Sequence, residues 1–125
     1  MAARTPRVLL VEDEFLVSDM ISSVLVERGF EVHAVASATE ALRHLMGGAP
    51  CDVLFTDINL PGGMDGAALA RRARELRPDL PVVYASGAVS GLGPGQAVPD
   101  SRFVGKPYSA TMLCALLARM AQERT

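Results

Sequence analysis

The sequence predicts an α/β fold in which five parallel strands form a doubly wound sheet with helices on both faces. Two observations carry this prediction. Short apolar runs alternate along the chain with segments of helical period, and the loops between them are short. The first apolar run, residues 7–11, is almost continuously hydrophobic, which is typical of a strand covered on both faces. Because 125 residues suffice for one core but not two, a single domain is expected over 1–125.

Strands are expected where apolar runs stop at acids, turn residues or glycine. The first run stops at three consecutive acids, and the third runs into Asp57 and a Pro-Gly-Gly turn. The five expected strands cover residues 7–11, 31–36, 53–55, 82–85 and 102–105.

Helical periodicity follows the first three expected strands and the last one. Ser37 and Glu40 have the spacing of a capping box, and Ser109 is suited to cap the last helix. The apolar stripes expected to face the core are Leu16, Met20, Ile21, Val24 and Leu25; Ala41, Leu42, Leu45 and Met46; Leu69, Ala70, Ala73 and Leu76; and Met112, Leu113, Leu116, Leu117 and Met120.

The helical pattern fails between Ala88 and Ser101. Three glycines and two prolines interrupt this stretch, so a regular helix of any length is not expected there. The fourth helix of the doubly wound arrangement is therefore predicted to be short, irregular or missing.

Composition excludes several classes of protein. A formal charge of −2 and a pI near 5.6 give no support for general nucleic-acid binding. No apolar run approaches the ~20 residues that span a bilayer, and the first residues do not resemble a signal peptide, so a cytoplasmic protein without membrane contact is expected. Cys51 and Cys114 lie in apolar contexts without metal-ligand spacing, which favours buried free thiols over a disulfide.

Asp57 follows the third expected strand, where a buried charge is costly unless a cation or polar group compensates it. One interpretation is that Asp57 accepts a phosphoryl group. The other is that it caps the turn that follows, because aspartate is common at such positions. The strand alone does not separate the two.

Other polar residues end the neighbouring strands: Glu12 and Asp13 the first, Ser86 the fourth and Lys106 the fifth. The ends of parallel strands open on one edge of the sheet, so these side chains are expected to converge with Asp57. Three crowded acids favour a hard divalent cation, and Mg²⁺ needs only a few protein oxygens. A lysine and a hydroxyl beside them favour an added anionic group such as phosphoryl.

The chain closely resembles the receiver domain of bacterial two-component response regulators, over almost its whole length. This resemblance implies the flavodoxin-like or CheY-like strand order 2-1-3-4-5 and a phosphorelay signalling role rather than an enzyme. The motifs that carry it are Val11-Glu12-Asp13-Glu14, Asp57-Ile58-Asn59-Leu60-Pro61-Gly62-Gly63-Met64-Asp65-Gly66, Ser86-Gly87 and Lys106-Pro107-Tyr108.

The resemblance implies a role for each residue of the acidic group. Asp57 would take a phosphoryl group from a phosphohistidine of a histidine kinase or phosphotransfer protein. Asp13 would be the main Mg²⁺ carboxylate beside Asp57, Glu12 would assist, and Asn59 would offer its backbone carbonyl.

The resemblance also implies a switch. Ser86 would turn toward the phosphoryl group, Lys106 would pair with it, and Phe103 would be the aromatic that changes rotamer; the alternative for Phe103 is an ordinary core aromatic. Pro107 matches a proline that typically follows a cis bond.

Two departures from the family pattern stand out. Strand one ends in Glu12-Asp13 where many relatives have two aspartates, which leaves the metal's fine geometry open. The stretch Tyr84-Ala85-Ser86-Gly87 is similar to the FATGUY subgroup, in which the fourth helix is short or mobile. The movement of Ser86 would then reposition the loop of residues 88–101, and output would depend on this loop and on the last helix.

Alternatives remain at this point. The chain could be a single-domain regulator that acts on a protein partner as a monomer or weak dimer, a phosphate sink, or a receiver cut from a hybrid kinase. A Mg²⁺-dependent aspartyl-phosphate phosphatase of the haloacid-dehalogenase type would want aspartate where Asn59 stands. A dinucleotide-binding fold would need its glycines after the first strand, not at 91–95.

Overall fold

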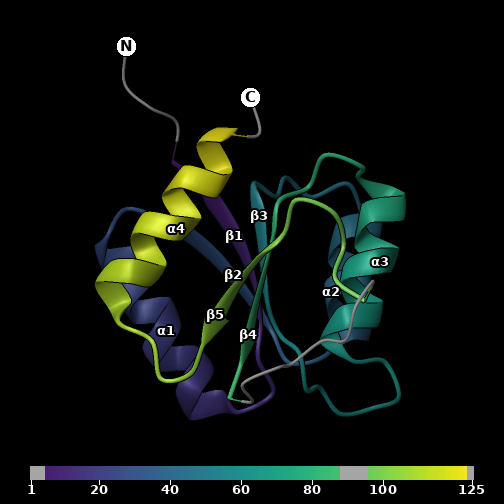
Figure 1. Cartoon of the computed structure of the whole chain (residues 1–125), viewed down its shortest axis with the longest axis horizontal. Coiled ribbons are helices and arrows are strands. Elements are labelled where there is room, and N and C mark those ends of the chain that lie inside the picture. Colours follow the sequence, from purple (N-terminus) through teal and green to yellow (C-terminus); the bar gives the residue numbers. More distant parts are fainter. Residues whose placement is uncertain (1–4, 88–95, 124–125) are drawn as a thin grey trace.

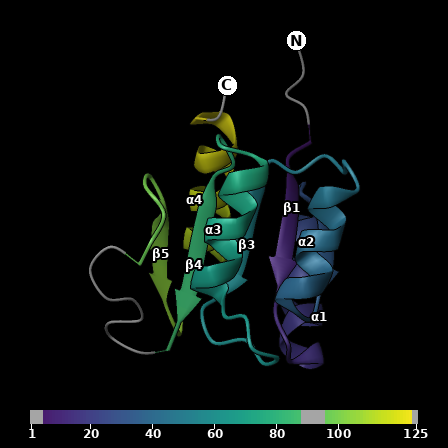
Figure 2. The same cartoon turned by 90° about the vertical axis from the view of Figure 1, so that its right-hand side faces the viewer.

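A five-stranded parallel sheet forms the centre of the molecule. The computed structural model describes residues 5–87 and 96–123, and Figures 1 and 2 show the sheet between two helical layers. The strand order is β2-β1-β3-β4-β5, which confirms the predicted fold class and order. The strands are β1 (Arg7–Val11), β2 (Glu31–Val35), β3 (Val53–Asp57), β4 (Val82–Ser86) and β5 (Arg102–Gly105).

Four helices in the described residues cover the sheet, with α1 and α4 on one face and α2 and α3 on the other (Figure 1). The predicted lack of a regular helix is confirmed for residues 96–101, which form turns and bends, whereas 88–95 lie outside the described residues. The helices are α1 (Phe15–Glu27), α2 (Ala38–Met46), α3 (Gly66–Leu76) and α4 (Ala110–Glu123).

The predicted helix caps are present. The Glu40 amide donates to Ser37 Oγ at 3.2 Å, and Glu40 Oε2 accepts from the Ala36 amide at 3.0 Å. The Met112 amide donates to Ser109 Oγ at 3.0 Å. Each cap satisfies a helix N–H that lacks an intrahelical partner, so short sequence patterns fix where these helices begin.

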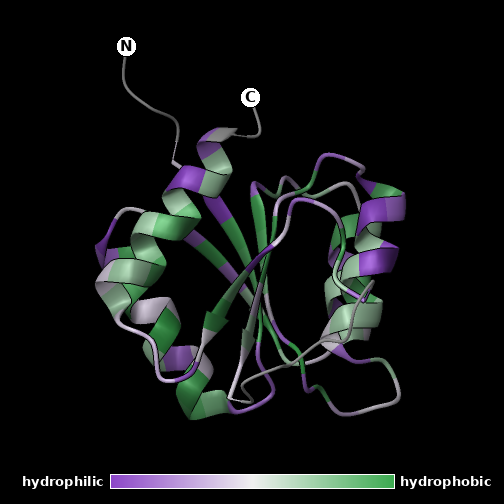
Figure 3. Ribbon diagram, viewed as in Figure 1, coloured by the Kyte–Doolittle hydropathy of each residue, from purple (hydrophilic) through white to green (hydrophobic). Residues whose placement is uncertain are grey.

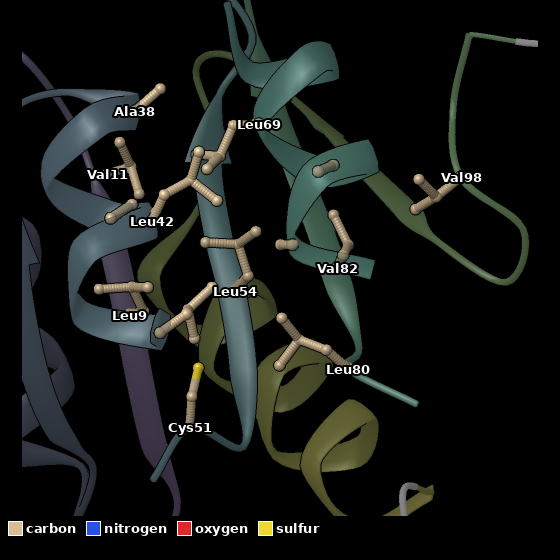
Figure 4. Close-up of a cluster of buried hydrophobic side chains, with 14 of the residues drawn as sticks. Leu9, Val11, Ala38, Leu42, Cys51, Leu54, Leu69, Leu80, Val82 and Val98 are labelled. Carbon is tan, nitrogen blue, oxygen red and sulfur yellow. The ribbon is translucent and has the colours of Figure 1, made fainter. Parts of the chain in front are cut away.

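Two apolar layers flank the sheet because successive side chains of a strand point to opposite faces. Leu9 and Leu54 pack toward α2 and α3, as Figure 4 shows, while Leu10 and Phe55 pack toward α1 and α4. The strands at the centre of Figure 3 are accordingly apolar.

The two cysteines lie in different layers. Cys51 is buried on the α2–α3 side and Cys114 on the α1–α4 side, and both are free thiols as predicted. The sheet stands between them, which explains why they do not form a disulfide.

Five residues that were predicted to face the core from the helical stripes are exposed instead, so the prediction is wrong for them. Leu16, Met20, Met46, Leu76 and Met112 are 45–80% exposed. A helix that rests on a flat sheet buries only a narrow stripe, so apolar residues at its flanks project into solvent. Periodicity predicts the direction of an apolar stripe but not the width that the partner surface covers.

No helix in the described part of the chain is long and apolar enough to cross a membrane.

Candidate functional site

Three carboxylates meet at the carboxyl edge of the sheet, as predicted. Oxygens of Glu12, Asp13 and Asp57 lie within 4.8 Å of one another. Glu12 directly follows β1, Asp57 ends β3, and Val11 pairs with Thr56 in the parallel register of the two strands. Glu12 is buried and Asp13 is exposed, so the cluster is open to solvent at Asp13.

Lys106, the residue directly after β5, pairs with two acids of this cluster. Its Nζ lies 3.0 Å from Asp57 Oδ2 and 3.9 Å from Glu12 Oε1. Its backbone amide donates a 2.8 Å hydrogen bond to the Ser86 carbonyl, so the end of β4 positions the backbone of Lys106. Burial alone lowers the pKa of Lys106, but the hydrogen bond and charge of Asp57, with the charge of Glu12, outweigh it and raise this pKa.

The Glu12 carboxylate is held by backbone as well as by charge. Glu12 Oε2 accepts a 3.0 Å hydrogen bond from the Glu14 amide. Burial raises the pKa of Glu12, and the charge of Asp57 raises it further. The hydrogen bond from the Glu14 amide and the charge of Lys106 lower this pKa. The pKa of Glu12 is thus raised overall, first of all by burial, and the three carboxylates gathered at this edge favour a further cation.

The backbone around Asp57 is packed against the start of α3. The Asn59 amide donates to Asp57 Oδ1 at 3.3 Å, and the Gly66 amide donates to the Ile58 carbonyl at 2.7 Å. A Cβ added at Gly66 would lie 2.1 Å from the Asp57 carbonyl oxygen. Gly66 therefore permits the close approach that positions Asp57, a role that the sequence signals only by a glycine directly after the Asp65 cap.

Ser86 is the last residue of β4, and Phe103 lies on the neighbouring strand β5, where it pairs with Tyr84. Asp57 pairs with Ala85, and Ser86 follows as the last, wholly buried residue of β4. Phe103 is 42% exposed, and its ring centroid lies 6.2 Å from that of Tyr84. The alternative of an ordinary core aromatic at Phe103 is thus excluded. The predicted cis bond between Lys106 and Pro107 is present.

Comparison with known proteins identifies the family. Residues 8–118 match the profile of the response regulator receiver domain. The chain belongs to this family. A receiver protein from Sinorhizobium medicae WSM419 superposes with a TM-score of 0.90 at 34% identity, covering 98% of both chains.

Two curated relatives show the range of proteins in which similar receivers occur. "Response regulator receiver protein CpdR" of Brucella abortus (strain 2308) is 35% identical over 82% of this chain and 85% of its own length. "Sensor kinase CckA" of the same organism is 32% identical over 94% of this chain but only 13% of its own length. The chain spans 26% and 45% of two further relatives.

The receiver site has one further aromatic neighbour, Tyr108, which the motif Lys-Pro-Tyr could have signalled as a site residue. Its ring meets that of Phe55 edge-on, with centroids 6.0 Å apart and planes at 74°. Burial, followed by the charges of Glu12 and Asp57, raises the pKa of Tyr108 to about 12. The Tyr108 ring thus packs against the apolar layer on the α1–α4 side, within the influence of the carboxylate charges.

The donor set fits a magnesium ion. Carboxylate oxygens are the hard ligands that Mg²⁺ prefers, and the exposed side of the cluster leaves room for the waters or phosphate oxygens that it retains. The described residues at this edge provide oxygens from Glu12, Asp13 and Asp57 rather than sulfur or imidazole.

Proposed function

We propose that Asp57 of this receiver domain accepts a phosphoryl group from the phosphohistidine of a histidine kinase or phosphotransfer protein in a Mg²⁺-dependent reaction. One observation carries the proposal. A lysine ammonium group lies 3.0 Å from a largely buried carboxylate that also adjoins two further acids. A metal site alone does not need the lysine, whereas a transferred phosphoryl group does.

The transfer exchanges one bond for another. An Asp57 carboxylate oxygen forms the new O–P bond while the P–N bond to the donor imidazole breaks and its electron pair returns to nitrogen. Asp13, Asp57, Glu12 and the backbone carbonyl of Asn59 would hold Mg²⁺. When bound, Mg²⁺ supplies positive charge to the phosphoryl oxygens and offsets the crowding of acids.

Lys106 offsets negative charge both before and after the transfer. It already neutralises Asp57, and its Nζ can move to a phosphoryl oxygen without leaving the site. A phosphoryl group brings about two negative charges, so the ammonium group gains in importance once Asp57 is modified.

We further propose that Ser86 and Phe103 form the switch that controls a protein partner. Ser86 is the buried last residue of β4, and its carbonyl oxygen accepts a hydrogen bond from the Lys106 amide. Phe103, on the next strand, has its ring partly in solvent and so can change position at low steric cost. A shift of Ser86 toward the phosphoryl group would therefore be transmitted to an exposed aromatic.

The phosphodonor must cover the surface next to Asp57, and α1 begins there. Phe15, Leu16 and Met20 are 62–80% exposed on this helix, directly after the acidic residues. Beside them, a cleft of about 210 Å³ between α1 and α4 is lined by Met20, Tyr108 and Leu113. We propose that the helices of the donor protein pack on this apolar surface.

A receiver cut from a hybrid kinase is the second candidate, which the similarity to a sensor kinase favours. A phosphate sink is a third role with the same chemistry at Asp57. Phosphotransfer profiling separates them: a stand-alone regulator is labelled fastest by a kinase encoded elsewhere, and an excised receiver by the kinase core of its own protein.

The chemistry is tested with radiolabelled acetyl phosphate and Mg²⁺. Stoichiometric labelling is expected in the wild type and in the control Asp79→Asn, an exposed aspartate in the loop before β4, and no labelling in Asp57→Asn. Labelling that persists in Asp57→Asn contradicts the proposal. Sustained turnover of phosphate esters would instead indicate a phosphatase.

A further inference from the structure

A buried tyrosine of β4 holds the chain that leads into β5. Tyr84 is 0% exposed and lies between Thr56 of β3 and Phe103 of β5 in the strand register. The backbone N–H of Val98 donates a hydrogen bond of 3.1 Å to the Tyr84 hydroxyl. Burial raises the pKa of Tyr84, and the Val98 amide only partly opposes this, so the phenol is neutral at physiological pH.

Val98 is held from three sides. Its side chain is 7% exposed and joins the apolar cluster of Leu80 and Val82, toward which Figure 4 shows it pointing. Its carbonyl accepts a 2.7 Å hydrogen bond from Ser101 Oγ. Because a buried backbone N–H without a partner is costly, the Tyr84 hydroxyl is what makes burial of Val98 favourable.

The same tyrosine also contacts the exposed aromatic of β5. Tyr84 and Phe103 are cross-strand partners, with ring centroids 6.2 Å apart and planes at 42°. The hydroxyl of Tyr84 therefore holds Val98, and its ring packs beside Phe103 five residues later. The Tyr84 side chain thus contacts both the segment that precedes β5 and Phe103 within β5.

We propose that the Tyr84 hydroxyl is a positioning group that fixes residues 96–101 on the sheet and thereby sets the exposure of Phe103 in the unphosphorylated domain. This inference goes beyond phosphoryl transfer and depends on the proposed function only for the role of Phe103 as a switch. The hydrogen bond between Val98 and Tyr84 is measured without phosphorylation. A failure of Asp57 to be labelled would refute the proposed function but would leave this test unaffected.

The first test is amide hydrogen exchange, followed by NMR, in Tyr84→Phe. This variant keeps the ring that fills the core and removes only the hydroxyl, which accepts from the Val98 amide and also interacts with the Ser101 side chain. Exchange of the Val98 amide is expected to rise roughly tenfold or more, because the buried N–H loses its partner. The control Tyr108→Phe removes the other phenol and should leave Val98 unchanged. Unchanged Val98 exchange in Tyr84→Phe overturns the proposal.

The second test measures the exposure of position 103. The chain has no tryptophan, so Phe103→Trp introduces a single tryptophan that can be excited selectively over the two tyrosines. In this background Tyr84→Phe should raise the acrylamide quenching constant by up to about twofold, since position 103 starts at 42% exposed. Tyr108→Phe should not change it. Faster Val98 exchange with the same quenching constant would show that Tyr84 does not set Phe103, and the proposal would fail.

Discussion

Replacing Gly66 by alanine tests whether the start of α3 positions Asp57. The added Cβ would lie 2.1 Å from the Asp57 carbonyl oxygen and 2.8 Å from Ile58 Cα, whereas ordinary contact begins at 3.4 Å. Both neighbours are backbone atoms, so a rotamer change cannot relieve the overlap. The helix must retreat by roughly 1 Å, which would stretch the Gly66–Ile58 hydrogen bond of 2.7 Å.

The expected cost of Gly66→Ala is about 3 kcal/mol, the upper end of the range for overpacking, and a fall in melting temperature of about 10 °C. Phosphorylation by acetyl phosphate should slow as well, because Asp57 shifts with its backbone. Thermal unfolding and labelling rates measure the two effects.

The control is Gly47→Ala. Its Cβ would meet the Arg43 carbonyl oxygen at 3.4 Å, an ordinary contact, and its φ of −74° suits alanine. Its stability should change by less than about 0.5 kcal/mol. Alanine is a better helix former than glycine by about 1 kcal/mol, so Gly66→Ala would stabilise α3 if the added Cβ had room. Gly66→Ala with wild-type or higher stability would therefore refute the close-packing argument.

Three further predictions follow from the charges and the exposed surface. Lys106→Met should slow phosphorylation by acetyl phosphate by roughly 100-fold, and Arg72→Gln, which removes an exposed cation from α3, should not. Burial, then the charges of His33 and Arg77, lowers the pKa of His44, so its neutral form favours the fold. The urea midpoint should accordingly fall as pH drops below about 6.5, and less so in His44→Gln; equal falls would contradict this. Leu16→Ala with Met20→Ala should slow transfer from a kinase at least tenfold but not from acetyl phosphate, and equal slowing with both donors would exclude a docking role.

The convergence of the site residues was predictable because it depends on topology alone. Once the apolar runs are parallel strands, their ends share one edge, and Glu12, Asp57 and Lys106 must meet there. The caps at Ser37 and Ser109 were predictable for a similar reason, since each is a contact within four residues.

Contacts between elements were not predictable from local pattern. The exposure of Leu16 and Met112 depends on how much of each helix the sheet covers, and the hydrogen bond from Val98 to Tyr84 joins residues 14 apart. The segment 88–101 reads as one irregular stretch in sequence. Its last six residues are nevertheless fixed by a buried side chain that carries no local signal.

At the acidic cluster, the position of the carboxylates and their chemical role can be tested with separate variants. Glu12 accepts a hydrogen bond from the Glu14 amide and Asp57 one from the Asn59 amide, so the backbone helps to position each carboxylate beside its ion pair with Lys106. Asp57→Asn should therefore keep the geometry of the site and remove only the acceptor. Gly66→Ala should do the reverse, because it displaces the backbone that carries Asp57 and removes no charged group. If both variants lose labelling but only Gly66→Ala loses stability, the site requires a correctly placed carboxylate, which is what phosphoryl transfer to Asp57 demands.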